Sequence, residues 1–307
     1  MPKQVIASEI VLSILPNCKP EVTEIMEKKL LTVNDSRIAY IETGEPSAPP
    51  VLLLHGFPET SLMWEAIVPT LQKNGYRAIA PDLPGFGQSE PMRQASTWEN
   101  YIDFITRFLD ALRIADVHLV VHDWGGLIGL RWACDHSARV KSLVLSSFTF
   151  SLDYEWHELA QAFRTPQKGE AVFKQLAENK ELWQERMRTL IPAVTREQLT
   201  DFYGIYKSPE SRRVALELYR SGDLDKLVPY QEKLKQMECP VTVISGEMDM
   251  FVPVSFASSF QDLIAHANIH KLPDAGHFVY MEQTEIVSGI IADHFVKMNL
   301  GGKPMNT

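Results

Sequence analysis

Short apolar runs alternate with helix-like segments along much of this chain, and this alternation is the feature that most restricts its fold. The runs are PVLLLHG (50–56), YRAIAPD (76–82), VHLVVHD (117–123), VKSLVLSS (140–147), PVTVISGE (240–247) and, more weakly, IHKLPDAGH (269–277). Segments with the apolar spacing of helices separate most of them, at 61–75, 97–114 and 126–140. Crossovers of this length connect parallel strands, so the sequence predicts an α/β fold with a mostly parallel sheet flanked by helices.

Two regions depart from the alternation. KLLTV (29–33) and RIAYIET (37–43) are β-like runs joined by NDS, which predicts a hairpin. Residues 149–237 are rich in Glu, Gln, Lys and Arg at helical spacing and contain no buried-strand run, which predicts a helical cap inserted into the core. The predicted organisation is a core of residues 29–148 and 238–307, a cap of residues 149–237, and an N-terminal extension of residues 1–28 packed on or beside the core.

The charge balance and the cysteines limit the partners and the compartment. Acidic residues outnumber basic ones by 39 to 30, which gives a net charge of −9, whereas nucleic acids and anionic membranes favour a basic face. The chain has three scattered cysteines without a CxxC pair, a poor signal-peptide pattern, and no apolar run approaching roughly 18 residues, so we expect a cytoplasmic protein. We expect a small apolar substrate and water as partners, no metal and no cofactor, and leave a homo-oligomer open.

Chemically capable side chains follow the strands at the edge of the sheet where ligands bind. Asp123 follows the third apolar run of this series, Asp249 the fifth and His277 the sixth. The turn around Asp123 has the small-x-nucleophile-x-Gly pattern of a nucleophile elbow, and the chain order nucleophile, acid, histidine is the one found in α/β-hydrolases. Glu247 lies two residues from Asp249 and is an alternative acid, although the Gly-x-x-Asp spacing favours Asp249.

Five motifs together resemble the aspartate-nucleophile branch of the α/β-hydrolase superfamily, the epoxide hydrolases and haloalkane dehalogenases. They are HGFPE (55–59), DLPGFGQS (82–89), VVHDWGG (120–126), GEMD (246–249) and GHF (276–278). The resemblance implies the α/β-hydrolase fold and a covalent ester between Asp123 and a saturated carbon of the substrate. It further implies that His277 activates the water that opens this ester, that Asp249 orients His277, and that the backbone N–H groups of Phe57 and Trp124 bind the oxyanion.

The same resemblance leaves two reactions to distinguish, because an epoxide oxygen needs an acid whereas a halide needs two polarised N–H donors. Phe57 stands where one dehalogenase group has Asn, which favours the epoxide. In the cap, the segment ending in Tyr219 and Arg220 resembles the part of epoxide hydrolases that supplies a ring-opening tyrosine, which assigns that role to Tyr219.

The second cap acid stays open between two residues. Tyr154 and His157 fit its position about equally well, and Trp156 beside them occupies the place of a second halide donor in a dehalogenase. The favoured function is therefore an epoxide hydrolase with an apolar pocket under the cap, and the alternative is a haloalkane dehalogenase that uses the same Asp123, Asp249 and His277. A more distant alternative is a ligand-binding homologue without turnover.

Overall fold

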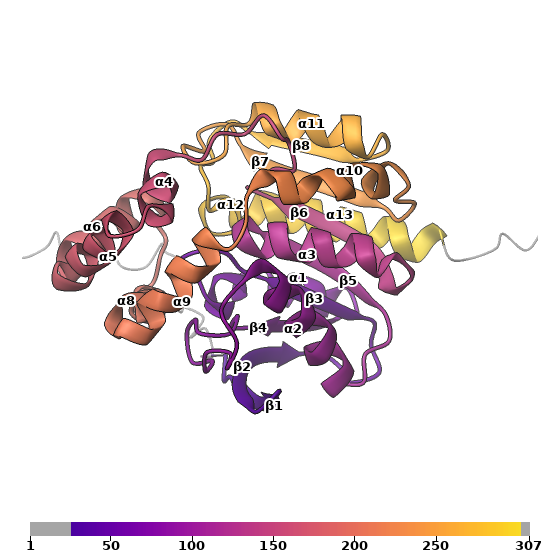
Figure 1. The fold of residues 1–307 in the computed structure, drawn as a ribbon. Coiled ribbons are helices and arrows are strands. Elements are labelled where there is room, and N and C mark those ends of the chain that lie inside the picture. Colours follow the sequence, from indigo (N-terminus) through magenta and orange to yellow (C-terminus); the bar gives the residue numbers. More distant parts are fainter. Residues whose placement is uncertain (1–25, 302–307) are drawn as a thin grey trace, which may run out of the picture.

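Eight strands form one mixed sheet in the part of the chain that the structure, a computed structural model, describes, namely residues 26–301, with side chains to residue 296 (Figure 1). Their order across the sheet is β1-β2-β4-β3-β5-β6-β7-β8, and only the β1–β2 and β2–β4 pairs are antiparallel. The strands are β1 (Lys29–Val33), β2 (Ser36–Thr43), β3 (Pro50–Leu54), β4 (Arg77–Pro81), β5 (Val117–His122), β6 (Val140–Ser146), β7 (Val241–Gly246) and β8 (Asn268–Leu272). Each apolar run of the sequence forms a strand, so the predicted fold class is confirmed.

The first two strands form the predicted hairpin. Asn34 and Asp35 connect them, and both have positive φ angles, 49° and 65°. A two-residue turn of this handedness matches the twist of the paired strands, and Asn and Asp tolerate the left-handed region better than most residues. The local sequence NDS therefore determines the register of this hairpin.

Helices cover both faces of the sheet (Figure 1). Contacts link α1 (Val68–Lys73) to α13 (Thr284–Gly301) on one face, and α2 (Trp98–Ala111) to α3 (Asp123–Asp135) on the other. The predicted helix over 61–75 is wrong in extent, because a 3-10 turn, η1 (Ser61–Trp64), precedes the short α1. Pro69 lies in the first turn of α1. Because an α-helix tolerates proline only in its first turn, α1 begins there and does not continue from η1.

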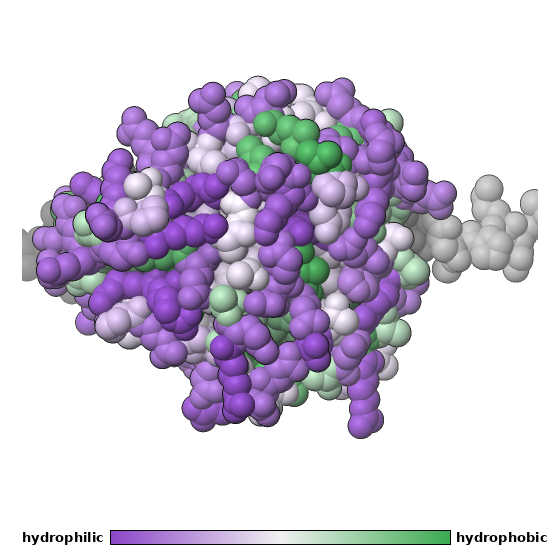
Figure 2. All heavy atoms as spheres, in the orientation of Figure 1, coloured by the Kyte–Doolittle hydropathy of each residue, from purple (hydrophilic) through white to green (hydrophobic). Residues whose placement is uncertain are grey.

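The segment between β6 and β7 is helical, as expected of the cap. It contains α4 (Glu158–Arg164), α5 (Lys168–Glu178), α6 (Lys180–Leu190), α7 (Arg196–Phe202), α8 (Gly204–Lys207), α9 (Pro209–Arg220), η3 (Leu224–Leu227) and α10 (Val228–Lys235). In Figure 1 α4 to α9 extend to one side of the sheet, and Figure 2 shows that this side has a largely hydrophilic surface. Although α10 lies inside the predicted cap range 149–237, it packs against α3 and against α11 (Ser255–Leu263) beside the sheet.

The predicted N-terminal extension, residues 1–28, lies outside the described residues except for residues 26–28. In the last of these, Lys28 reaches into the protein and contacts Asp82 and Asp201. No helix within residues 26–301 is both long and apolar enough to cross a membrane.

The turn from β5 into α3 requires small residues. Asp123 has φ of 48°, and a Cβ added to Gly125 would collide with the backbone carbonyls of Leu54 and His55. A Cβ added to Gly126 would likewise collide with the ring of Phe148. The two glycines after Asp123 therefore let α3 begin directly against β3 and hold the elbow in a conformation that is unfavourable for a residue with a side chain.

We predict different effects on stability for two glycine-to-alanine substitutions in helices. Gly125→Ala should lower the free energy of unfolding by about 1–3 kcal/mol, because the new methyl group meets rigid backbone. Gly289→Ala in α13, where nothing lies within 4 Å of the added Cβ, should leave stability unchanged or raise it by up to about 1 kcal/mol. Urea unfolding of both variants measures the difference, and equal effects would contradict the close approach at the elbow.

Candidate active site

Asp123 lies at the carboxyl end of β5, the strand in the middle of the sheet, with its side chain partly exposed to a cavity. The backbone N–H of Phe57, which follows β3, donates a hydrogen bond of 2.8 Å to Asp123 Oδ1. The other oxygen, Oδ2, lies 3.5 Å from His277 Nε2. One carboxylate oxygen is thus held by the backbone, while the other faces the imidazole.

The imidazole of His277 lies between two carboxylates. Its Nδ1 is 2.8 Å from Asp249 Oδ2. Asp249 Oδ1 accepts hydrogen bonds from the backbone N–H groups of Phe251 and Val252, so the loop after β7 fixes this carboxylate. Glu247 is exposed, and the structure brings Asp249 rather than Glu247 to His277.

Asp123 and His277 shift each other's pKa. Burial alone would lower the pKa of His277, but the carboxylates of Asp249 and Asp123 outweigh it and hold that pKa well above its usual value. Burial likewise acts to raise the pKa of Asp123, but the hydrogen bond and charge of His277, together with the Phe57 N–H, outweigh it and lower that pKa. The free site therefore contains an ionised carboxylate beside an imidazolium.

Asp123 lines a cavity of about 240 Å³ between the core and the cap. Most of its wall is apolar, and its polar side chains include His277, His157 and Tyr219. Leu176 and Leu182, from α5 and α6, contribute to the outer wall. A smaller space of about 30 Å³ shares Asp123, His157 and Tyr219 with this cavity and is also lined by Trp124, Tyr154 and Trp156. The cavity suits a small apolar molecule with one polar group near Asp123.

Tyr219 projects from α9 of the cap toward the core and is 5% exposed. Its ring packs edge to face against Trp124, with centroids 4.8 Å apart, and against Phe57 at 5.4 Å. Burial and the charge of Asp123 raise the pKa of Tyr219 well above its usual value, although a hydrogen bond with the Trp124 side chain opposes them. Tyr219 therefore keeps its hydroxyl proton at neutral pH.

His157 and Tyr154, the two alternatives near the start of the cap, have different bonding. Tyr154 donates its hydroxyl proton to the carbonyl oxygen of Phe251, at 3.0 Å. His157 is the N-cap of α4, and its Nδ1 accepts from the backbone N–H of Ala160 at 3.3 Å. Burial lowers the pKa of His157 despite the charge of Asp123. Because a neutral imidazole that accepts at Nδ1 carries its proton on Nε2, His157 is an N–H donor on the cavity wall.

Trp124 and Trp156 stack on each other, with ring centroids 5.7 Å apart and planes inclined by 19°. The indole N–H of Trp156 donates to Asp223 Oδ1 at 3.2 Å, and the guanidinium of Arg164 lies 4.7 Å from the centroid of its ring. Trp156 therefore supplies an apolar face to the smaller space, while its polar group is bound elsewhere.

One pair of ionisable side chains behind the site, Glu59 and His122, was not predicted from the sequence. Glu59 is fully buried, and its Oε1 lies 3.2 Å from His122 Nε2. The ring of His122 in turn lies 5.0 Å from that of His277, and its Nδ1 is 3.1 Å from Ser146 Oγ. Glu59 closes the HGFPE motif, so a carboxylate within an otherwise buried turn was the available signal. In the described part of the chain, no group of three or more His, Cys, Asp or Glu side chains could hold a metal ion.

The chain is similar in sequence to a known fold family and to known enzymes. The α/β-hydrolase fold family matches residues 49–284. The chain belongs to the α/β-hydrolase fold family. Haloalkane dehalogenase of Mesorhizobium japonicum is 26% identical over 282 residues, which cover 87% of this chain and 90% of that enzyme. Haloalkane dehalogenase of Mycobacterium marinum is 41% identical over 113 residues, but these cover only 36% of this chain and 38% of that enzyme.

Solved structures of two activities resemble this α/β-hydrolase. Haloalkane dehalogenase DbeA of Bradyrhizobium elkanii has 26% identity and a TM-score of 0.76, with 90% of this chain and 99% of that chain covered. An epoxide hydrolase of Vigna radiata has 25% identity and a TM-score of 0.73, with 88% and 98% covered. The predicted membership of the superfamily, as a hydrolase of its dehalogenase-like branch, is confirmed.

We predict that the charge of Asp123 maintains the imidazolium of His277. Asp123→Asn removes one of the two carboxylates that raise the pKa of His277, so that pKa should fall. NMR titration of the imidazole measures it, with Asp103→Asn, an exposed change on α2 (Trp98–Ala111), as the control. An unchanged His277 pKa in Asp123→Asn would contradict the coupling.

Proposed function

We propose that this protein is an epoxide hydrolase that opens an apolar epoxide to a diol through an ester on Asp123. The single observation that carries the proposal is that Tyr219 and His157, one O–H and one N–H donor from the cap, line the same cavity as Asp123. An epoxide leaves as an alkoxide and needs such donors on the side of the cavity opposite the nucleophile.

The bonding of Asp123 supports a division of labour between its oxygens. Oδ1 accepts from the Phe57 N–H, as an oxyanion oxygen does, so Oδ2 is the oxygen that attacks the epoxide carbon. The carbon–oxygen bond of the ring breaks, and the released oxygen takes its proton from Tyr219 while it accepts a hydrogen bond from the Nε2–H of His157. The product of this half-reaction is a hydroxyalkyl ester of Asp123.

The pKa shifts support the order of the second half-reaction. Formation of the ester removes the negative charge of Asp123, one of the two charges that raise the pKa of His277. That pKa then falls, so the imidazolium gives up a proton, which restores the hydroxyl of Tyr219. Neutral His277 can then accept a proton from water. The water attacks the carboxyl carbon of Asp123, the Phe57 and Trp124 backbone N–H groups stabilise the oxyanion, and the diol leaves. Asp249 holds the Nδ1 side of the imidazole throughout.

His157 is the better supported partner of Tyr219. Its Nε2 carries the proton, and its side chain lines the cavity beside Asp123. Tyr154 lines only the smaller space and donates its hydroxyl proton to Phe251 O, so it would have to give up that hydrogen bond to serve an epoxide.

Haloalkane dehalogenation is the second candidate, and the names of the Mesorhizobium and Mycobacterium relatives favour it. Halide release needs two N–H donors. Phe57 offers no side-chain N–H, and Trp156 donates its own to Asp223. The indole N–H of Trp124 hydrogen-bonds Tyr219, and that of Trp183, which also lines the cavity, hydrogen-bonds Tyr206. These contacts favour an alkoxide over a halide as the leaving group.

We predict that the purified protein converts styrene oxide to its diol and releases no bromide from 1-bromobutane under the same conditions. Tyr219→Phe should reduce diol formation by about 10²-fold or more, since one general acid typically contributes 10²–10⁴-fold. Tyr230→Phe, which loses a hydroxyl bound to Asp135 outside the cavity, is the matched control and should retain full activity. Bromide release without diol would reverse the assignment, and an unaffected Tyr219→Phe would remove Tyr219 from the reaction.

A further inference from the structure

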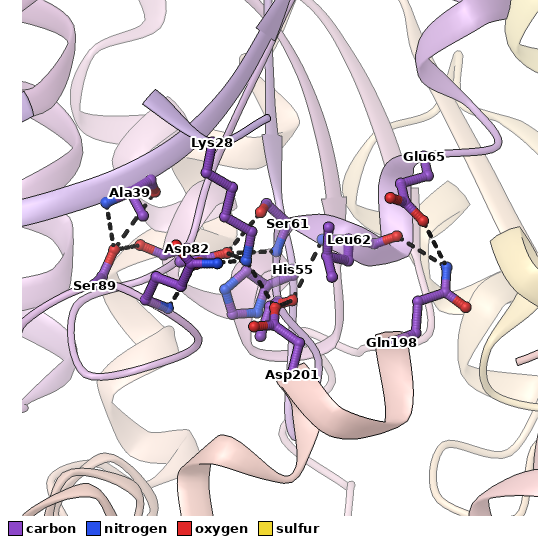
Figure 3. Close-up of polar contacts among 12 residues, drawn as sticks. Lys28, Ala39, His55, Ser61, Leu62, Glu65, Asp82, Ser89, Gln198 and Asp201 are labelled. Carbon is purple, nitrogen blue, oxygen red and sulfur yellow. Dashed lines mark hydrogen bonds and ion pairs between the residues drawn. The ribbon is translucent and has the colours of Figure 1, made fainter. Parts of the chain in front are cut away.

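Lys28, just before the first strand, is buried between a carboxylate of the core and one of the cap (Figure 3). Its ammonium nitrogen lies 2.8 Å from Asp82 Oδ2, 3.1 Å from Asp82 Oδ1 and 2.7 Å from Asp201 Oδ2. The side chains of Lys28 and Asp82 are 3% and 0% exposed, and that of Asp201 is 15% exposed. Lysine is seldom buried so completely unless its charge is paired.

On the core side, Asp82 holds the start of η1 (Ser61–Trp64). It follows β4, and its Oδ1 accepts hydrogen bonds from both the backbone N–H and the hydroxyl of Ser61, at 2.9 and 2.6 Å. Its Oδ2 accepts from the backbone N–H of Gln88 at 2.9 Å. Asp82 thereby joins the turn after β4 to the turn after β3, and both turns lie at the edge of the sheet that carries Asp123.

On the cap side, α7 (Arg196–Phe202) binds the same turn. Asp201 accepts from the hydroxyl of Thr60 at 2.5 Å, and Gln198, one helical turn earlier, donates to the carbonyl oxygen of Leu62 at 3.1 Å. In Figure 3 the two side chains approach η1 from the same helix. The turn between Phe57 and Leu62 is therefore held by Asp82 on the core side and by α7 on the cap side.

The positive charge of Lys28 compensates the negative charge of the two carboxylates that face it. Asp82 and Asp201 both turn toward the ammonium group, and without it two ionised carboxylates would face each other with little water between them. Their repulsion would act across the contact between core and cap. The chain segment that would move lies three to four residues from Phe57, whose N–H binds Asp123 Oδ1.

We propose that Lys28 is a positioning residue, which locks α7 of the cap and the turn of residues 57–62 together and so keeps the Phe57 N–H aimed at Asp123. This inference rests on the proposed function for its effect on rate. The Phe57 N–H contributes most when the oxyanion forms, so loss of Lys28 should slow hydrolysis of the ester more than its formation. A purely structural role would reduce thermal stability and leave the ratio of the two rates unchanged.

The test compares Lys28→Met with Lys29→Met. Lys29 is the adjacent residue, and its ammonium group pairs with Glu42 on the surface, with 56% of its side chain exposed. In single turnovers with styrene oxide, well below the unfolding temperature, Lys28→Met should hydrolyse the Asp123 ester about tenfold or more slowly, since small displacements at a site cost up to about 10²-fold. Lys29→Met should match the native protein. Equal ester hydrolysis in all three proteins would overturn the proposal.

A double variant and a hydrogen-exchange measurement test the proposal further. If Lys28→Met does not fold, Lys28→Met/Asp201→Asn removes the repulsion between the two carboxylates but does not restore the ammonium bridge between Asp82 and α7. Ester hydrolysis should therefore stay slower than in the native protein, and a native rate would overturn the proposal. Hydrogen exchange of the peptide containing residues 57–62 reads the position of this turn without any substrate. Faster exchange in Lys28→Met but not in Lys29→Met is expected even if epoxides prove not to be substrates, whereas unchanged exchange would contradict the positioning role itself.

Discussion

Asp123, His277 and Asp249 form a series in which the imidazole lies between two carboxylates, 3.5 Å from Asp123 Oδ2 and 2.8 Å from Asp249 Oδ2. These three side chains come from turns after β5, β8 and β7, and only a parallel sheet brings the carboxyl ends of such strands together. Despite burial, the carboxylates of Asp249 and Asp123 hold the pKa of His277 well above its usual value, and His277 in turn lowers the pKa of Asp123. In the proposed reaction, the resting site therefore holds a ready nucleophile, and its base is released only when the nucleophile has been consumed.

In the proposed reaction, the cap supplies the donors for the leaving group. Tyr219 is buried and protonated, His157 carries its proton on Nε2 because Nδ1 caps α4, and both line the cavity above Asp123. The same cap is fixed to the core through α7, Asp201 and Lys28, at the turn that carries the Phe57 N–H. Binding of the leaving group and binding of the oxyanion are thus connected through one set of polar contacts between the two parts of the fold.

Much of the fold and of the triad was predictable from sequence, because both depend on local patterns. Apolar runs ending in Gly, Asp or His identify buried strands and their ends, and the small residues around Asp123 identify the elbow. The sequence alone could not separate Tyr154 from His157. Tyr154 donates to the carbonyl oxygen of Phe251, which is distant in sequence, and His157 accepts a capping hydrogen bond from the Ala160 N–H. Nor could it predict that Trp156 gives its N–H to Asp223, or that Lys28 pairs with a carboxylate 173 positions away. Such contacts depend on the packing of the cap on the core, for which a single sequence offers no periodic signal.

In the proposed mechanism Asp123 bonds covalently to the substrate, and water then attacks the carboxyl carbon of Asp123. The decisive measurement is a single turnover of styrene oxide by excess enzyme in ¹⁸O-labelled water, followed by mass spectrometry of the peptide that contains Asp123 and of the diol. We expect one heavy oxygen in the Asp123 carboxyl group and an unlabelled diol. Heavy oxygen in the diol, with none in Asp123, would mean that water attacks the epoxide directly and that no ester forms on Asp123.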